Sequence, residues 1–204
     1  MKYYIFGAGG HSKVVLDAMI ELNLSCNGFL DTSSKIEHCG LQVLNPSSQD
    51  LINMTNTSFH IAIGSCKVRE ELSKDNKNLS FFSISHPKTT ISSTASILEG
   101  CFLASGSIIA ADSSIGRHCI INHNAIIDHE CIVGDFSHIS PGAVLGGKVK
   151  VGRGVHIGLG AIILPGLVIE DYATVGAGAL VTRNVNSFTT VFGSPAKESY
   201  REIY

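Results

Sequence analysis

Asp128, His129 and Glu130 place an imidazole between two carboxylates at consecutive positions in the second half of the chain. A carboxylate beside a histidine holds one tautomer of the ring and increases its basicity, as a general base near neutral pH requires. The same triplet also occurs as a simple cluster of surface charges. It therefore predicts either a proton acceptor for a group-transfer reaction or a solvated ion cluster.

His138 and His156 lie 18 residues apart in the same half of the chain. If the chain coils once every 18 residues, these two rings stack about 5 Å apart on one wall. Such a stack suits either a metal site, since imidazole is a common ligand, or the lining of a ligand groove. A metal would need a third ligand from another subunit, and we expect no metal to be required.

A glycine-rich turn, Gly7-Ala8-Gly9-Gly10-His11-Ser12, follows the first predicted strand. Small residues let a phosphate approach the backbone, and the following helix offers free N–H groups and a positive dipole end. Asp31, at the end of the next predicted strand, is positioned to accept hydrogen bonds from a nucleoside. Ser12 replaces the third glycine of the dinucleotide fingerprint. Because about 85 residues are too few for a full six-stranded dinucleotide domain, we expect a mononucleotide or nucleotide-sugar site, with a turn that binds nothing as the alternative.

An aliphatic residue recurs at every sixth position from Ile91 to Val181, through sixteen hexads without exception. Four residues after each of them stands a small or aliphatic residue, from Ala95 to Val185. Six residues of an α-helix advance about 600°, so this period cannot hold one helical face. It fits a chain wound around a triangular prism, with three hexads per coil and a little over five coils.

Three of the six cysteines, Cys101, Cys119 and Cys131, fall in the small register of this repeat. We therefore expect buried packing thiols rather than catalytic or disulfide-bonded ones. Before the repeat, strands are predicted at 2–6, 26–30, 59–63 and 81–85, and helices at 12–22 and 67–74. Alternating strands and helices indicate a parallel sheet, so the chain divides into an α/β domain over 1–86 and a prism over 87–204.

Composition excludes several classes of protein. Fifteen Lys and Arg against 17 Asp and Glu give a net charge of −2, whereas a nucleic-acid binder needs clustered excess cations. A hydrophobic fraction of 44% is too high for disorder. No apolar run approaches the roughly 18 residues of a membrane helix, and no export signal stands at the N-terminus. We expect a reduced, cytoplasmic protein without a nucleic-acid or membrane partner.

Several motifs, in order along the chain, together resemble the hexapeptide-repeat sugar O- and N-acyltransferases. They are Gly7–Val15, Asp31, the His86-Pro87 junction, Asp128–His138 and the closing Val191–Lys197. This family includes sialic acid O-acetyltransferases and the nucleotide-4-amino-sugar N-acetyltransferases of bacterial glycan synthesis. The resemblance implies a Rossmann-like nucleotide-sugar-binding domain followed by a left-handed parallel β-helix. It also implies acetyl-CoA as cosubstrate and a homotrimer with a groove between neighbouring prisms.

The resemblance further implies roles for individual residues. His129 would be the general base and Glu130 would increase its basicity. The substrate nucleotide would be held by Gly9, Gly10, His11, Asp31 and Gly64, and the acetyl-CoA site would comprise His138, Gly147, Gly158, Leu159 and Ala177. Two positions depart from the family pattern: Thr32 stands where some members carry a second acidic residue, and Ala177 where glycine can occur.

The function that we predict is direct acetyl transfer from acetyl-CoA to the 4-amino group of a nucleotide-linked amino-deoxy sugar. A thioester already has a good leaving group, so the enzyme must mainly orient two substrates and remove a proton. A backbone N–H near Gly147 is a candidate donor to the thioester oxygen. The alternative is O-acetylation of sialic acid or a related nonulosonic sugar. More distant alternatives are a gamma-type carbonic anhydrase-like metal enzyme and a non-catalytic nucleotide-sugar-binding scaffold.

Overall fold

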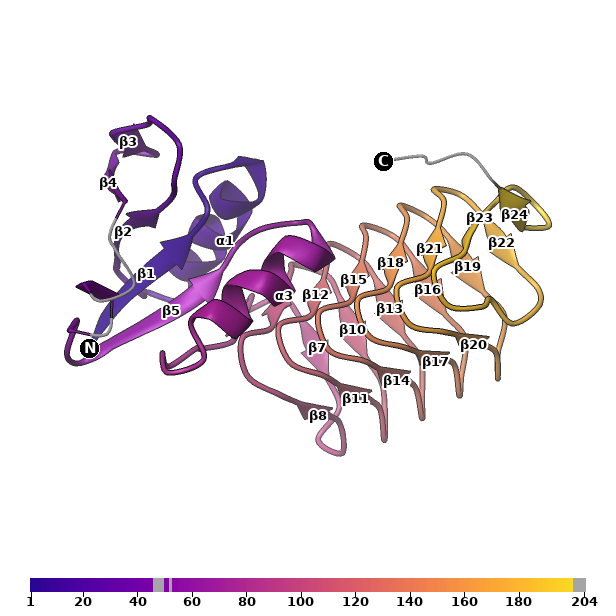
Figure 1. The fold of residues 1–204 in the computed structure, drawn as a ribbon. Helices are drawn as coiled ribbons and strands as arrows, with labels where there is room; N and C mark the ends of the chain where they lie inside the picture. Colours follow the sequence, from indigo (N-terminus) through magenta and orange to yellow (C-terminus); the bar gives the residue numbers. More distant parts are fainter. Residues whose placement is uncertain (46–49, 52, 200–204) are drawn as a thin grey trace.

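The computed structural model describes residues 1–45, 50–51 and 53–199, as a small α/β domain joined to the end of a long solenoid (Figure 1). The sheet of the first domain has the order β3-β4-β2-β1-β5. Its strands are β1 (Lys2–Phe6), β2 (Cys26–Leu30), β3 (Glu37–His38), β4 (Leu41–Leu44) and β5 (Thr57–Ile61). All pairs are parallel except β3 with β4. The helices are α1 (Gly10–Glu21) and α3 (Cys66–Asp75).

The sequence predicts β1 and β2 at their observed bounds and both helices to within two residues at either end. The predicted strand at 59–63 is displaced by two residues relative to β5, and the β3–β4 hairpin was not predicted. The predicted strand at 81–85 divides between two sheets. Phe81 forms a parallel bridge with Phe59, whereas β6 (Ile84–Ser85) already pairs with the solenoid. The hydrogen bond from Ile84 N to Cys101 O, 2.8 Å long, begins that pairing.

The solenoid has three parallel walls of two-residue strands, as the six-residue period predicts. Wall I holds β6, β9 (Phe102–Leu103), β12 (Ile120–Ile121), β15 (His138–Ile139), β18 (His156–Ile157), β21 (Thr174–Val175) and β23 (Thr190–Phe192), with β24 (Lys197–Ser199) antiparallel at its end. Wall II holds β7 (Thr90–Ile91), β10 (Ile108–Ile109), β13 (Ile126–Ile127), β16 (Val144–Leu145), β19 (Ile162–Ile163) and β22 (Leu180–Val181).

Wall III holds β8 (Ser96–Ile97), β11 (Ser114–Ile115), β14 (Ile132–Val133), β17 (Lys150–Val151) and β20 (Val168–Ile169). Partners from β6 to β22 are 18 residues apart, for example His138 with His156, whereas Thr174 of β21 pairs with Thr190 of β23, 16 residues on. The predicted α/β domain followed by a parallel solenoid that matches a left-handed β-helix is confirmed.

The interior of the solenoid consists of the two predicted registers. The aliphatic register is buried from Leu103 to Val181, and burying each of these side chains stabilises the fold by about 1.5–3 kcal/mol. Polar side chains of the small register form hydrogen bonds between successive coils at the corners. Ser137 Oγ donates to Gly152 O at 2.7 Å and accepts from Val155 N at 3.1 Å. Cys119 lies free and fully buried at an equivalent position, and its Sγ donates to Gly134 O. Buried packing thiols are thus confirmed.

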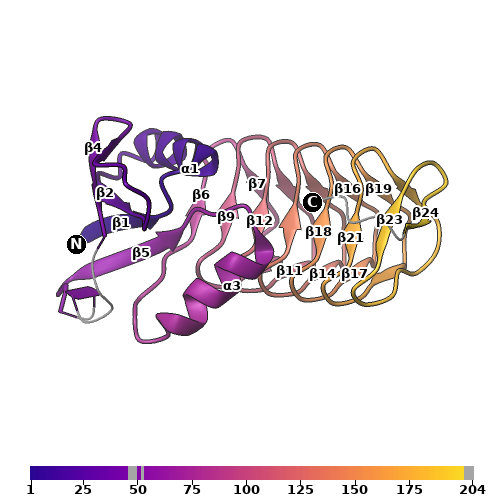
Figure 2. The ribbon, with the colours of Figure 1, turned by 45° about the horizontal axis from the view of Figure 1, so that its top comes forward.

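The α/β domain packs on the outer face of wall I through its helix α1, and α3 lies along the same end of the solenoid (Figure 2). Phe102 and Ile120 project outward from wall I and share one buried cluster with Val15 and Met19 of α1. The two domains therefore have a common core, which fixes the beginning of α1 against the solenoid. No helix in the described ranges is long and apolar enough to cross a membrane.

Candidate active site

The predicted base lies at a corner of the solenoid between β13 and β14, on the edge shared by walls II and III. His129 Nδ1 and Glu130 Oε2 are 3.0 Å apart, and the His129 side chain is 52% exposed. The backbone N–H of His129 donates to Asp128 Oδ1 at 2.8 Å. Because the carboxylate accepts from Nδ1–H, the lone pair of Nε2 is directed away from Glu130, as a proton acceptor requires.

Gly147, on the next coil, makes room for the His129 ring. A Cβ added to Gly147 would lie 2.5 Å from both Cε1 and Nε2 of His129. Real Cβ atoms do not approach ring atoms this closely, so any larger residue would displace the imidazole. Gly147 therefore sets the position of the predicted base, in addition to the backbone role expected from the sequence.

A second cluster lies on wall I, where the solenoid meets the α/β domain. His138 is buried, and its ring stacks on that of His156 with the centroids 5.1 Å apart, close to the spacing expected from the sequence. His138 Nδ1 lies 3.2 Å from Gly64 O, and Nε2 lies 3.1 Å from Asn122 Nδ2. The amide of Asn122 is oriented by His123 N, which donates to its Oδ1. These partners define a neutral ring with the proton on Nδ1.

His11, at the beginning of α1, joins this cluster. Its ring lies 6.3 Å from that of His138 and edge-on to Phe102 at 5.3 Å. Its Nε2 is buried without a hydrogen-bond partner. Burial, followed by the positive charges of Arg69 and of His123 when protonated, lowers the pKa of His11 to about 4. Burial and Arg69 likewise lower the pKa of His138 to about 3.

The ring nitrogens of the histidine stack already have polar partners in the fold. Both nitrogens of His138 are bonded, and His156 Nε2 lies 3.1 Å from Ser140 Oγ. Within residues 1–45, 50–51 and 53–199, no three His, Cys, Asp or Glu side chains form a group that would hold a metal. The bonds to His138 disfavour the metal alternative.

The α/β domain contains a cavity of about 420 Å³ at the carboxyl ends of β1 and β2. Gly7, Asp31 and Thr32 are among its lining residues. Asp31 accepts from Ala8 N at 2.6 Å and from Ser33 N at 2.8 Å, so its carboxylate also shapes the glycine turn. Burial alone would raise the pKa of Asp31, but these amides outweigh it and lower the pKa.

The other residues predicted for the nucleotide lie outside the lining of this cavity. Gly9 and Gly10 are exposed at the beginning of α1, with open space where a Cβ would stand. Gly64 lies beside His138, to which its carbonyl is bonded. The predicted site residues thus occupy the cavity and the edge of wall I rather than one continuous pocket.

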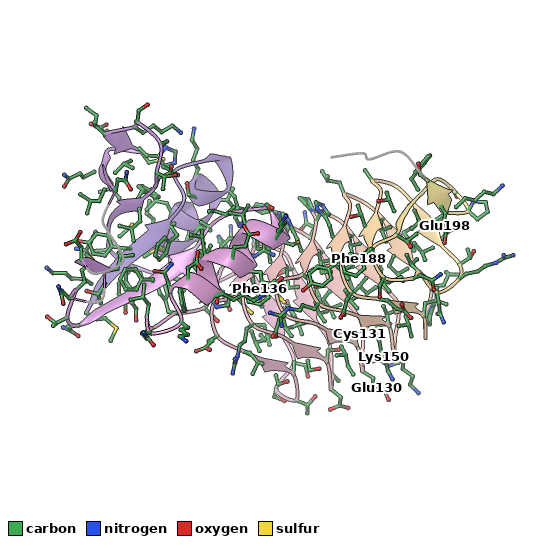
Figure 3. All side chains as sticks on the ribbon, viewed as in Figure 1. Glu130, Cys131, Phe136, Lys150, Phe188 and Glu198 are labelled. Atoms are coloured by element: carbon green, nitrogen blue, oxygen red, sulfur yellow. The ribbon has the colours of Figure 1, made fainter. Side chains whose placement is uncertain are left out.

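The remaining residues predicted for the coenzyme lie on the corner shared by walls I and II. Gly158 and Leu159 occupy this corner on one coil and Ala177 on the next. Leu159 is 55% exposed, and a Cβ on Gly158 would lie 2.6 Å from Ala177 N. The predicted residues thus fall into two groups, which we call half-sites. One comprises His129, Glu130 and Gly147 at the corner of walls II and III, and the other comprises His11, His138 and the Gly158 corner. Figure 3 shows Glu130 at the lower edge of the solenoid and Phe136 beside α3.

Comparison with known proteins matches both parts of the chain. Residues 2–75 match the family model of the PglD N-terminal domain, and residues 78–175 match that of the GMPPB C-terminal domain. PerB from Caulobacter crescentus, solved with CoA and GDP-perosamine, is 30% identical, with a TM-score of 0.92 over 98% of this chain and 97% of that one. The chain belongs to the hexapeptide-repeat sugar acyltransferases. The predicted resemblance is thereby confirmed.

Two further relatives agree across both domains of this acyltransferase. The acetyltransferase domain of PglB from Neisseria gonorrhoeae, solved with acetyl coenzyme A, is 30% identical, with a TM-score of 0.91 over 97% of this chain and 98% of that one. WeeI from Acinetobacter baumannii is 28% identical, with a TM-score of 0.87 over 98% of this chain and 100% of that one. No curated protein matched the chain in a search by sequence.

Two residues of this acyltransferase were missed by sequence reasoning. Asn122 holds His138 Nε2, and it lies on the preceding coil, two positions after the residue that pairs with His138. The 18-residue period of the coils was a sequence signal that could have pointed to Asn122 as a neighbour of His138. Arg69 is 1% exposed and bonds to main-chain carbonyls of both domains. No sequence signal marks it, because a basic residue on a short polar helix is ordinarily solvated.

Proposed function

We propose that this chain transfers an acetyl group from acetyl-CoA directly to the 4-amino group of a nucleotide-linked amino-deoxy sugar. The observation that carries the proposal is the agreement with the perosamine N-acetyltransferase of C. crescentus over both domains. That enzyme was solved with CoA and GDP-perosamine. An acetyltransferase solenoid with a nucleotide-type cavity at its end explains why the two domains are joined.

In the proposed mechanism, His129 is the general base. The sugar amine attacks the carbonyl carbon of the thioester and loses a proton to His129 Nε2, and the CoA thiolate leaves. Glu130 accepts from Nδ1–H at 3.0 Å and keeps the lone pair on Nε2. Gly147 leaves space for the ring, and the His129 side chain is half exposed, so an incoming substrate can reach it. His138 and the Gly158 corner hold the pantetheine arm and the thioester.

The two half-sites become one site if copies of the chain assemble as a homotrimer. His129 and His138 lie on different edges of a single solenoid, so one chain does not bring them together. Wall II separates them, and its outward side chains are aliphatic: Ile108, Ile126, Val144, Ile162 and Leu180. Ile108 and Ile162 are 37% and 47% exposed, and such a stripe favours association. Packing wall II around a three-fold axis sets the His129 corner of one copy against the His138 edge of the next.

A thiol-release assay tests the proposed reaction. Acetyl-CoA is supplied with a panel of UDP- and GDP-linked 4-amino sugars and with free sialic acid. We expect rapid turnover of one nucleotide amino sugar and a product that carries an amide. Turnover of sialic acid alone would contradict the proposed substrate and favour O-acetylation.

Mixed trimers test the shared site. We expect the His129→Ala and His138→Ala chains each to have little activity alone, and we expect activity to return when both are expressed together. A site made from two copies then contains His129 from one and His138 from the other. Absence of any recovery in purified mixed assemblies would place both residues in one chain's site.

We also propose a cytoplasmic location. The six cysteines are free, which agrees with a reducing compartment.

A further inference from the structure

Arg69 is a buried cation whose partners are main-chain carbonyls. Its Nε donates to His118 O at 2.9 Å, one terminal nitrogen to Ile63 O at 2.8 Å and Gly64 O at 3.0 Å, and the other to Phe136 O at 2.5 Å. These carbonyls come from the loop after β5 and from two consecutive corners of the solenoid. The guanidinium therefore fixes the loop that precedes α3 relative to wall I.

The loop held by Arg69 carries the partner of His138. Gly64 O lies 3.0 Å from the Arg69 guanidinium and 3.2 Å from His138 Nδ1. A carbonyl has two lone pairs, so it accepts from both groups, and the ring must place its proton on Nδ1. The charged or titratable groups that face His138 are Arg69 from α3, His156 from β18 and His11 from α1.

We propose that Arg69 is a positioning residue for the acetyl-CoA site, which holds His138 as the neutral Nδ1–H tautomer through the carbonyl of Gly64. The inference rests on the proposed function for the role of wall I in coenzyme binding. A neutral, fixed ring presents a constant apolar and hydrogen-bonding surface to an uncharged thioester. A protonated ring would attract water or anions into the groove.

A purely structural role is the competing explanation, since Arg69 also attaches α3 to the solenoid. Glu70 provides the matched control. It is the next residue on α3, it is buried, and it attaches the same helix to the solenoid through Arg153 at 2.9 Å. Its other ion pair, with Lys74 at 2.8 Å, lies within α3. No bond of Glu70 leads to Gly64 or His138 in the part of the chain that the structure describes. Glu70→Gln therefore weakens the attachment of α3 without touching the tautomer.

The experiment measures the ring of His138 and the Kd of acetyl-CoA in the full-length protein. Histidine labelled with ¹⁵N reports the tautomer, and His138→Asn assigns the signal. In the wild type we expect a neutral ring with Nδ1–H at pH 5. In Arg69→Met we expect the ring to change tautomer or to become protonated at pH 5, and the Kd of acetyl-CoA to rise roughly 2- to 30-fold. Glu70→Gln should change neither.

Arg69→Lys keeps the positive charge but not the planar fork, and it serves where Arg69→Met fails to fold. We expect a neutral His138 and a raised Kd for acetyl-CoA. An Nε2–H ring in the wild type, a wild-type Kd in Arg69→Lys, or the same changes in Glu70→Gln would overturn the proposal. If the wild type does not bind acetyl-CoA at all, the proposed function fails, while the tautomer result still decides what Arg69 does to His138.

Discussion

The corner at 128–131 and the edge of wall I both present histidines, but in opposite environments. His129 is half exposed, with a carboxylate 3.0 Å from Nδ1. His138 is buried, with a carbonyl on one ring nitrogen and an amide on the other. The first ring is open to solvent, whereas burial and Arg69 lower the pKa of the second to about 3 and keep it neutral. The two environments suit the two roles that we propose, proton transfer for His129 and coenzyme positioning for His138.

The largest effect should come from removing the exposed ring. His129→Ala is expected to lower kcat by about 10²-fold or more, as is typical of losing a general base. The KM values should change little, because the coenzyme site that we propose lies mainly on the other half-site. Steady-state kinetics on the substrate identified by the thiol-release panel measure both constants. A kcat within a few-fold of the wild type would assign proton transfer to another group.

Gly147→Ala should have the next largest effect, because its Cβ would displace the His129 ring. A displacement of about 1 Å at a reacting group costs on the order of 10²-fold, so we expect a loss of about 10- to 100-fold in kcat. The double variant with His129→Ala provides the control. If Gly147 acts through His129, the second substitution adds no further loss. Additive losses would mean that Gly147 contacts substrate independently.

Glu130→Gln should produce a smaller effect, of about 10-fold in kcat. The amide is close in size to the carboxylate but presents either an oxygen or an NH₂ group to Nδ1, so it holds the tautomer less firmly. Lys148→Ala is the matched control, since Lys148 Nζ lies 3.6 Å from Glu130 Oε2 without reaching the ring. Equal losses in the two variants would indicate that the charge balance of the corner matters rather than the tautomer.

The last prediction concerns stability at low pH rather than activity, and it tests whether burial keeps a histidine of the α/β domain neutral. His60 is 1% exposed, and burial lowers its pKa to about 3, below the usual value near 6.5. Between these values the unfolded chain binds more protons, so the free energy of unfolding falls as pH decreases from 6.5 to 3. One such histidine contributes up to about 1.4 kcal/mol per pH unit.

His60→Phe should reduce this pH slope by about that amount, measured by urea unfolding at several pH values and one protein concentration. An unchanged slope would show that His60 does not account for acid sensitivity.

Much of the fold was encoded locally and periodically. The aliphatic register from Ile91 to Val181 predicted the strands from β7 to β22 on all three walls, because each hexad repeats one geometric unit. The strands β23 and β24 lie beyond this register and were not predicted. The end of the repeat differs: Ile91 is 39% exposed, since no coil lies beyond β7 in wall II. The strand predicted at 81–85 was divided between two sheets. The packing of the two domains decides which of its residues pair with β5 and which pair with the solenoid, and the local sequence does not encode that packing.

The candidate site divides in the same way. The sequence by itself determined the Asp128-His129-Glu130 triplet and the His138–His156 stack, because neighbours and coil partners follow from numbering alone. Only the tertiary structure placed Gly64, 74 residues away in the chain, on His138 Nδ1, and buried Arg69 between the domains. Contacts between distant segments depend on how two separately encoded surfaces pack, and no local pattern or repeat specifies that geometry.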